Sequence, residues 1–168
     1  IANYLVKRFN LSIDAHVLAE QKEKTVVEWF QTIQLTVMPF AVETVRAFRE
    51  SKFPLALVSS APMDEILVKV KRMGIEHLFD TIVSRSDVKE GKPFPDMYLL
   101  AAKRLGLSPR EMVAFEDTPS GVTSAHAAGM VSVAVPNDFS RRKPFPDADA
   151  IIPDLRHALP FVEELRNR

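Results

Sequence analysis

The spacing of hydrophobic residues changes at Pro39 and divides the sequence into two parts. Before Pro39, apolar positions recur at helical spacing, which predicts two helices within residues 1–34. The second helix begins near Ser12, whose hydroxyl can cap it, and continues to Gln34. After Pro39, short apolar runs alternate with amphipathic stretches, which predicts strands alternating with helices.

The second part predicts a parallel α/β sheet. The expected strands are 54–59, 81–83, 112–116, 131–135 and 149–152, and the expected helices are 41–51, 62–73, 95–105, 120–129 and 154–166. Residues 55–58 are apolar throughout, as in strands that are covered on both faces. Gly74 and Gly106 follow two of the helices as stop signals. This alternation indicates a parallel sheet with helices on both faces, where ligands bind at the carboxyl ends of the strands.

Composition and charge narrow the possible partners. The chain has 168 residues, of which 46% are hydrophobic and 26% charged, as expected for one globular domain with at most a small appendage. Its 22 basic residues equal its 22 acidic residues, so no net field attracts nucleic acid or an anionic membrane. The lack of cysteine excludes disulfides and thiol catalysis, and no apolar run approaches the roughly 20 residues of a membrane span. A small-molecule partner remains as the default.

Polar side chains lie at the ends of several expected elements. Ser59 and Ser60 follow the first strand, where hydroxyl and backbone N–H groups can hold a phosphate oxygen, although helix capping explains them too. Lys92 lies between Gly91 and Pro93 before a helix, where its ammonium group can neutralise a phosphate or a carboxylate. Taken alone, Lys92 fits a solvent-exposed loop lysine better.

Two adjacent carboxylates, Glu116 and Asp117, end the expected strand 112–116. Neighbouring like charges repel each other unless a cation or an ammonium group lies between them. Ligands that are all oxygen favour Mg²⁺ over softer metals, so the pair is a candidate magnesium site. The alternative is that Asp117 only caps the helix that begins at residue 120.

In this order, the three segments resemble motifs of the haloacid dehalogenase superfamily of hydrolases. Residues 57–60 are similar to the second motif of the family, residues 91–96 to the third, and residues 115–121 with 127–130 to the fourth. The last two are long and specific, and the resemblance covers nearly the whole chain. It is strongest to the β-phosphoglucomutase-like branch of sugar-phosphate phosphatases and mutases. The resemblance implies a Rossmann-like sheet flanked by helices.

The resemblance also implies a role for each candidate residue. Ser59, with Ser60 beside it, would bind the phosphoryl group, and Lys92 would neutralise the nucleophile and the phosphate. Asp117 would ligate Mg²⁺ with the help of Glu116. The implied activity is Mg²⁺-dependent hydrolysis of small phosphorylated metabolites such as sugar phosphates. A phosphomutase of the β-phosphoglucomutase type and a non-catalytic domain of the same fold are the alternatives.

Lys22 bears on the choice between phosphatase and mutase. It resembles a lysine of the helical cap that contacts substrate in the mutases, although an exposed helix face explains it slightly better. By the same resemblance, residues 1–36 are the end of the cap and residues 37–168 are the α/β core. A monomer or weak dimer in the cytoplasm is the default expectation.

The first family motif, Asp-x-Asp-x-Thr after an apolar strand, is missing. In the family it supplies the nucleophile that becomes an aspartyl phosphate. The only Asp-x-Asp here, at residues 147–149, precedes its strand, and the chain begins with Ile1 instead of Met. The resemblance therefore implies that the central strand, with the nucleophile, is absent from residues 1–168. We expect these residues alone to be inactive and marginally folded, because backbone groups beside the missing strand would lack partners.

Overall fold

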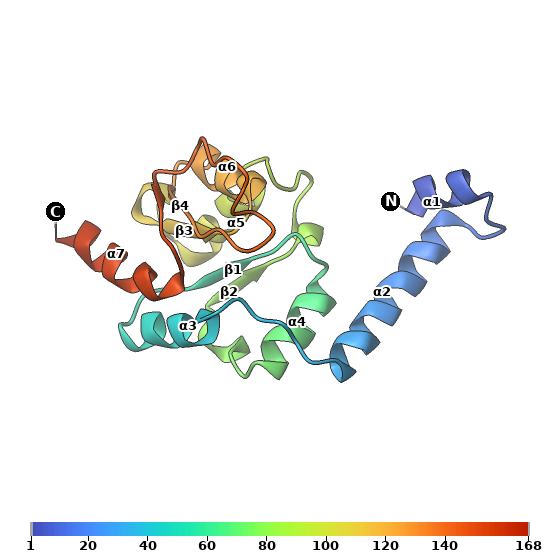
Figure 1. Cartoon of the computed structure of the whole chain (residues 1–168), viewed down its shortest axis with the longest axis horizontal. Coiled ribbons are helices and arrows are strands. Elements are labelled where there is room, and N and C mark those ends of the chain that lie inside the picture. Colours follow the sequence, from blue (N-terminus) through green and yellow to red (C-terminus); the bar gives the residue numbers. More distant parts are fainter. Residues whose placement is uncertain (1, 168) are drawn as a thin grey trace.

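The computed structural model describes residues 2–167 and confirms the alternation of strands and helices (Figure 1). The strands are β1 (Ala56–Val58), β2 (Thr81–Val83), β3 (Val113–Glu116), β4 (Val131–Ala134) and β5 (Ala150–Ile151). The helices are α1 (Ala2–Phe9), α2 (Ala15–Thr32), α3 (Ala41–Glu50), α4 (Met63–Arg72), α5 (Asp96–Leu105), α6 (Pro119–Ala127) and α7 (Ala158–Arg166). Short 3-10 turns occupy Glu76–Leu78, Arg85–Asp87, Pro109–Glu111 and Leu155–His157. Residue 1, where the predicted segment 1–36 begins, and residue 168, where the predicted segment 37–168 ends, lie outside the described range.

The strands form two parallel sheets. β1 pairs with β2, with Leu57 opposite Ile82, and β3 pairs with β4, with Phe115 opposite Val133. β5 adds a short strand on the other side of β4. Every pairing is parallel, so the predicted α/β class is confirmed.

The ends of the helices correct two details of the sequence-based boundaries. α2 is capped by Asp14, whose carboxylate accepts from two backbone N–H groups at 2.8 and 3.4 Å, so the cap predicted at Ser12 is wrong. α4 begins at Met63 with Pro62 as its N-cap residue, so the helix predicted over 62–73 begins one residue later than expected. Gly106 ends α5 with a φ of 69°, a left-handed conformation that glycine adopts without strain, so this predicted stop is confirmed.

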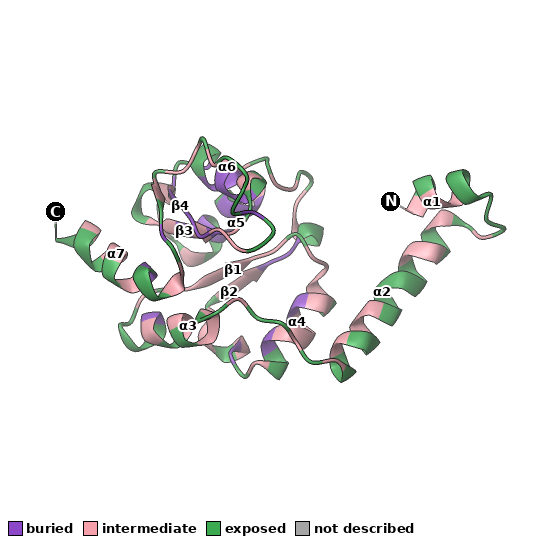
Figure 2. Cartoon of the chain, in the orientation of Figure 1, coloured by how far each residue is buried: buried purple, intermediate pink, exposed green. Residues whose placement is uncertain are grey.

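Helices cover both faces of the sheets. α5 and α6 pack on one face of β3, where Tyr98 and Ala125 share a buried cluster with Ala114. α3 and α7 cover the other face through Phe48 and Ala158. α3 and α4 likewise pack against one side of β1 and β2, and α5 packs against the other. Figure 2 shows buried residues on these helices and on β2, β3 and β4.

A gap separates the facing edges of β1 and β3, and we call it the slot. Both edges line a cavity of about 400 Å³, β1 through residues 55–58 and β3 through residues 112–116. No backbone ladder joins the two strands within residues 2–167. All of β1 is only partly buried, whereas three of the four residues of β4 are fully buried. Inner strands of an α/β sheet have a neighbour on each side, and β1 and β3 each have one.

α1 and α2 form an arm that extends away from the sheets (Figure 1). Neither helix contains a buried residue (Figure 2). Tyr4 and Trp29 are more than half exposed. The carboxyl end of α2 is attached to α4, where Arg72 donates to the backbone carbonyls of Phe30 and Ile33 at 2.5 and 2.7 Å. The arm therefore joins the core at one end and leaves its apolar side chains largely uncovered.

The boundary predicted between residues 1–36 and 37–168 lies in the segment between α2 and α3, and it stays a prediction. Among residues 2–167, no helix has both the length and the hydrophobicity needed to cross a lipid bilayer.

Asp87 ties the end of β2 to α5. Its carboxylate accepts from the backbone N–H and the hydroxyl of Ser84 at 2.8 and 2.6 Å, and from the Arg104 guanidinium at 2.7 Å. Arg104 also donates to the carbonyl of Ile82 at 2.7 Å. The hydrogen bonds from Ser84, together with the one from Arg104, lower the pKa of Asp87 from 3.8 to about 2. The ionised carboxylate therefore stabilises the folded chain.

We expect Asp87→Asn to lower the free energy of unfolding by about 2 kcal/mol at neutral pH. Because the folded pKa lies below the unfolded one, this contribution is present above the unfolded value of 3.8 and is lost as the pH falls through about 2. Urea denaturation at about pH 7 and at about pH 2.5 measures it. Glu163→Gln, at an exposed carboxylate, is the control, and an equal effect of Asp87→Asn at both pH values would contradict the prediction.

Candidate active site

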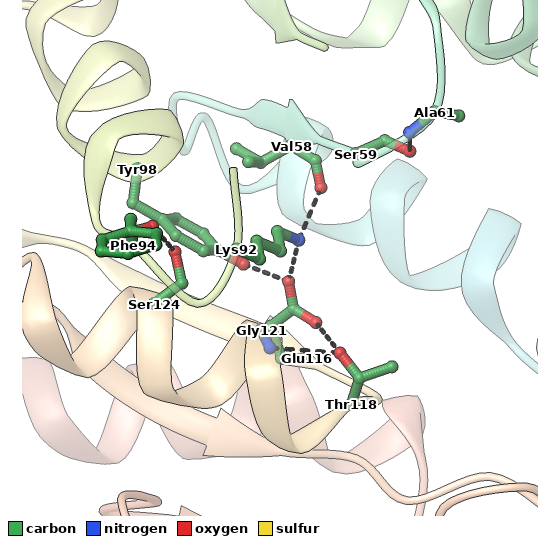
Figure 3. Close-up of polar contacts among 10 residues, drawn as sticks. All are labelled: Val58, Ser59, Ala61, Lys92, Phe94, Tyr98, Glu116, Thr118, Gly121 and Ser124. Atoms are coloured by element: carbon green, nitrogen blue, oxygen red, sulfur yellow. Dashed lines mark hydrogen bonds and ion pairs between the residues drawn. The ribbon is translucent and has the colours of Figure 1, made fainter. Parts of the chain in front are cut away.

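Lys92 lies where the two sheets meet. It belongs to the loop before α5, and its side chain is only 10% exposed. Its ammonium group donates to the carbonyl of Val58 at 3.2 Å and forms an ion pair with the carboxylate of Glu116 (Figure 3). Val58 ends β1 and Glu116 ends β3, so both sheets have their carboxyl ends at one edge. Lys92 is therefore not a solvent-exposed loop lysine.

Contacts on two sides fix the loop that carries Lys92. On one side, the Arg85 guanidinium donates to two backbone carbonyls of the loop at 2.8 and 3.1 Å. A Cβ atom at Gly91 would lie 2.7 Å from the Arg85 side chain, so glycine makes this approach possible. On the other side, the buried Ser124 of α6 donates to the carbonyl of Phe94 at 2.5 Å (Figure 3). The position of the ammonium group is thus set by the fold.

The carboxylate of Glu116 is buried and engaged on both oxygens. One oxygen accepts from Lys92 and from the hydroxyl of Tyr98, and the other accepts from the hydroxyl of Thr118 at 3.4 Å (Figure 3). Gly121 of α6 lies against the same carboxylate, since a Cβ atom there would overlap it. Burial, followed by the Glu116 charge, raises the pKa of Tyr98 well above its ordinary value, so the phenol keeps its proton and donates it.

Asp117 contacts a different part of the chain. Its Oδ2 atom accepts from the side-chain amide of Asn137 at 2.7 Å, and its Oδ1 atom has no hydrogen-bond partner among residues 2–167. Thr118 is the residue that caps α6, because its hydroxyl accepts from the N–H of Gly121 at 3.2 Å. The alternative in which Asp117 only caps this helix is therefore wrong.

The acid pair thus has two separate sets of partners. Glu116 pairs with Lys92, and Asp117 keeps one carboxylate oxygen open at the carboxyl edge of the sheet. Such an oxygen suits Mg²⁺, which typically takes one or two protein carboxylates and keeps several waters. In the described part of the chain, no three His, Cys, Asp or Glu side chains converge in a way that would hold a metal ion. Asp117 fits as a magnesium ligand, whereas the contacts of Glu116 fit a partner of Lys92.

Ser59 lies at the same edge, directly after Val58. Its backbone N–H donates to the carbonyl of Val83 at 2.9 Å, and its hydroxyl accepts from the N–H of Ala61 at 3.2 Å. Ser60 is exposed. The hydroxyl of Ser59 also has a proton to donate, so its contact with Ala61 leaves a phosphate interaction open.

Lys22 is not brought to these residues. It is exposed on α2, which packs against α4, and within residues 2–167 it has no polar partner. Sequence reasoning misses the residues that make two other contacts. Tyr98 belongs by its spacing to the apolar face of α5, and only its burial beside Glu116 gives the hydroxyl a role. Asn137 has a usable signal, because it follows β4 at the edge that also carries Asp117.

Comparisons with known proteins identify the family of this chain. The model of the haloacid dehalogenase-like hydrolase family matches residues 3–135. The chain belongs to this family. The protein CbbY of Rhodobacter capsulatus is 33% identical over 150 residues, which cover 86% of this chain and 66% of that protein. The fructose-1-phosphate phosphatase YqaB of Escherichia coli is 31% identical, over 80% of this chain and 70% of that protein.

A solved structure shows the same fold. The crystal structure of β-phosphoglucomutase from Clostridium difficile has a TM-score of 0.80 at 22% identity, over 96% of this chain and 73% of that one. Matches to three curated relatives span 66%, 43% and 48% of their full lengths. The activity and substrate of the whole haloacid dehalogenase-like protein are therefore proposals.

We expect Gly121→Ala to destabilise the protein by about 1–3 kcal/mol, because the added Cβ displaces the Glu116 carboxylate. Helix propensity alone predicts the opposite sign, since alanine is favoured over glycine inside a helix by about 1 kcal/mol. The midpoint of urea denaturation measures the change. Ser120→Ala, at the exposed neighbouring position, is the control, and a more stable Gly121→Ala protein would contradict the proposed contact.

Proposed function

We propose that this chain supplies most of the active site of a Mg²⁺-dependent phosphatase for small phosphorylated metabolites such as sugar phosphates. The observation that carries the proposal is Lys92, held between the ends of β1 and β3, at the edge where Asp117 keeps an open carboxylate oxygen. A fixed cation and a metal-binding carboxylate provide the charge neutralisation that phosphoryl transfer requires. A fructose-1-phosphate phosphatase and a hexitol phosphatase among the relatives support this class of substrate.

The contacts suggest a separate role for each residue. The ammonium group of Lys92 has three N–H donors, of which Val58 and Glu116 use two, so one is left for a phosphate oxygen or the nucleophile. The hydroxyl of Ser59 donates to a phosphoryl oxygen. Asp117 holds Mg²⁺, which when bound neutralises charge that develops on the phosphoryl group.

We place the nucleophile of this reaction in the slot. An extended segment placed between β1 and β3 would find a backbone edge on each side and would end beside Lys92. A carboxylate at that end attacks the phosphorus atom, displaces the substrate alcohol and becomes an acyl phosphate. A second acid protonates the leaving oxygen, and water then hydrolyses the acyl phosphate to regenerate the carboxylate.

We expect Lys92→Met and Asp117→Asn each to lower kcat by about 100-fold or more in protein joined to an upstream segment that places a nucleophile in the slot. Both changes nearly preserve side-chain size but remove a charge from the site. Release of inorganic phosphate from a hexose 1-phosphate measures the activity. Lys24→Met, at an exposed lysine on the arm, is the matched control for Lys92→Met, and full activity in either site variant would refute the assigned roles.

The products of the same assay separate the candidate functions. Free phosphate supports a phosphatase, and an isomeric hexose phosphate supports a phosphomutase, for which the fold shared with β-phosphoglucomutase is the specific observation. Neither product, across a panel of phosphorylated metabolites, would favour a non-catalytic domain.

We expect residues 1–168 alone to release no phosphate above background and to melt with low cooperativity. β1 and β3 each lack a neighbour along the slot, so the sheet is divided. Adding the upstream segment should give both activity and a sharp thermal transition, measured by calorimetry. Mg²⁺-dependent phosphatase activity of the 168-residue chain would show that the nucleophile does not enter through the slot.

A further inference from the structure

Asn137 faces Asp117 across the carboxyl edge of the sheet. The N–H of Val135, just after β4, donates to the carbonyl of Glu116 at 2.7 Å. This hydrogen bond aligns the ends of β3 and β4, so the residues that follow them are neighbours. The Nδ2 atom of Asn137 then donates to the Oδ2 atom of Asp117 at 2.7 Å.

The amide of Asn137 can present only its NH₂ group to Asp117. Its Oδ1 atom accepts from the backbone N–H groups of Phe139 and Ser140 at 2.8 and 3.1 Å, so backbone donors decide which way the amide points. The hydroxyl of Ser140 accepts from the N–H of Asn137 at 3.0 Å and donates to its Oδ1 atom at 3.2 Å. Ser140 is only 2% exposed, so this turn is anchored in the core.

The contact with Asp117 is additional to what the turn needs. The backbone and Oδ1 hydrogen bonds close the turn by themselves, and the N–H of Arg141 also donates to the carbonyl of Asn137 at 2.8 Å. The Nδ2 group therefore binds Asp117 and is not needed to hold the turn. It occupies Oδ2 and leaves Oδ1 as the open oxygen of that carboxylate.

We infer that Asn137 is a positioning residue that makes Asp117 present one oxygen to a cation and thereby favours Mg²⁺ over Ca²⁺. Mg²⁺ demands octahedral geometry, whereas Ca²⁺ accepts more oxygen ligands and can bind a carboxylate through both oxygens. Without the amide, the carboxylate of Asp117 can turn and offer both oxygens. This inference rests on the proposed role of Asp117 in holding Mg²⁺.

Asn137→Ala is the direct test, in protein that includes the upstream segment and without substrate. We expect its affinity for Mg²⁺ to fall about 10-fold, in the range usual for groups that orient metal ligands. Its affinity for Ca²⁺ should fall less, so the ratio of the two affinities drops. Titration calorimetry with each ion alone measures both, and Ser140→Ala should change the ratio in the same direction but by less.

Thr123→Val is the matched control, because Thr123 donates to Asp147 at 2.6 Å and so anchors the connection between β4 and β5 without touching Asp117. It should lower Tm and leave the ratio of ion affinities unchanged. If wild-type protein binds Mg²⁺ and Asn137→Ala keeps the wild-type ratio, the inference is overturned and the proposed function stands. If wild-type protein binds no Mg²⁺, the proposed metal site fails as well.

Discussion

The ion pair between Lys92 and Glu116 is the contact on which the rest of this site depends. The two side chains are 10% and 9% exposed, and an unpaired charge at such a position costs several kcal/mol. The surroundings are therefore built to keep the pair together. Tyr98 donates to Glu116, Gly121 leaves space for the carboxylate, and the carbonyl of Val58 accepts from Lys92. One interaction thus fixes β1, β3, α6 and the loop before α5 relative to one another.

That constraint also explains how two adjacent carboxylates can end one strand. Glu116 is the last residue of β3 and turns toward the ammonium group, whereas Asp117 follows the strand and meets the amide of Asn137. The charge of Glu116 is neutralised inside the protein, and the charge of Asp117 is met only by a neutral donor. Of the pair, Asp117 is therefore the one with charge left for an added cation.

The sequence predicts the elements well, because hydrophobic spacing and stop residues such as Gly106 act locally. It also places Ser59, Lys92 and Asp117 at one edge, since parallel strands carry their loops to the same side. It does not predict that Glu116 and Asp117 have different partners, because the partners of Glu116 come from three other segments. The N-cap residue of α2 is also not predictable from the sequence. Asp14 and Ser12 are both suitable capping residues, and only the path of the backbone selects between them.

The charges around the slot give the physical reason to propose a divalent cation. Lys92 and Glu116 cancel, so Asp117 leaves this edge with one negative charge. In the proposed function, a nucleophilic carboxylate beside Lys92 would add a second, and a phosphate ester would bring about two more at neutral pH. The Lys92 ammonium group is already paired with Glu116, so it would not offset all of this repulsion. A dication held by Asp117 would supply the remaining positive charge, and Lys92 would keep its buried partner.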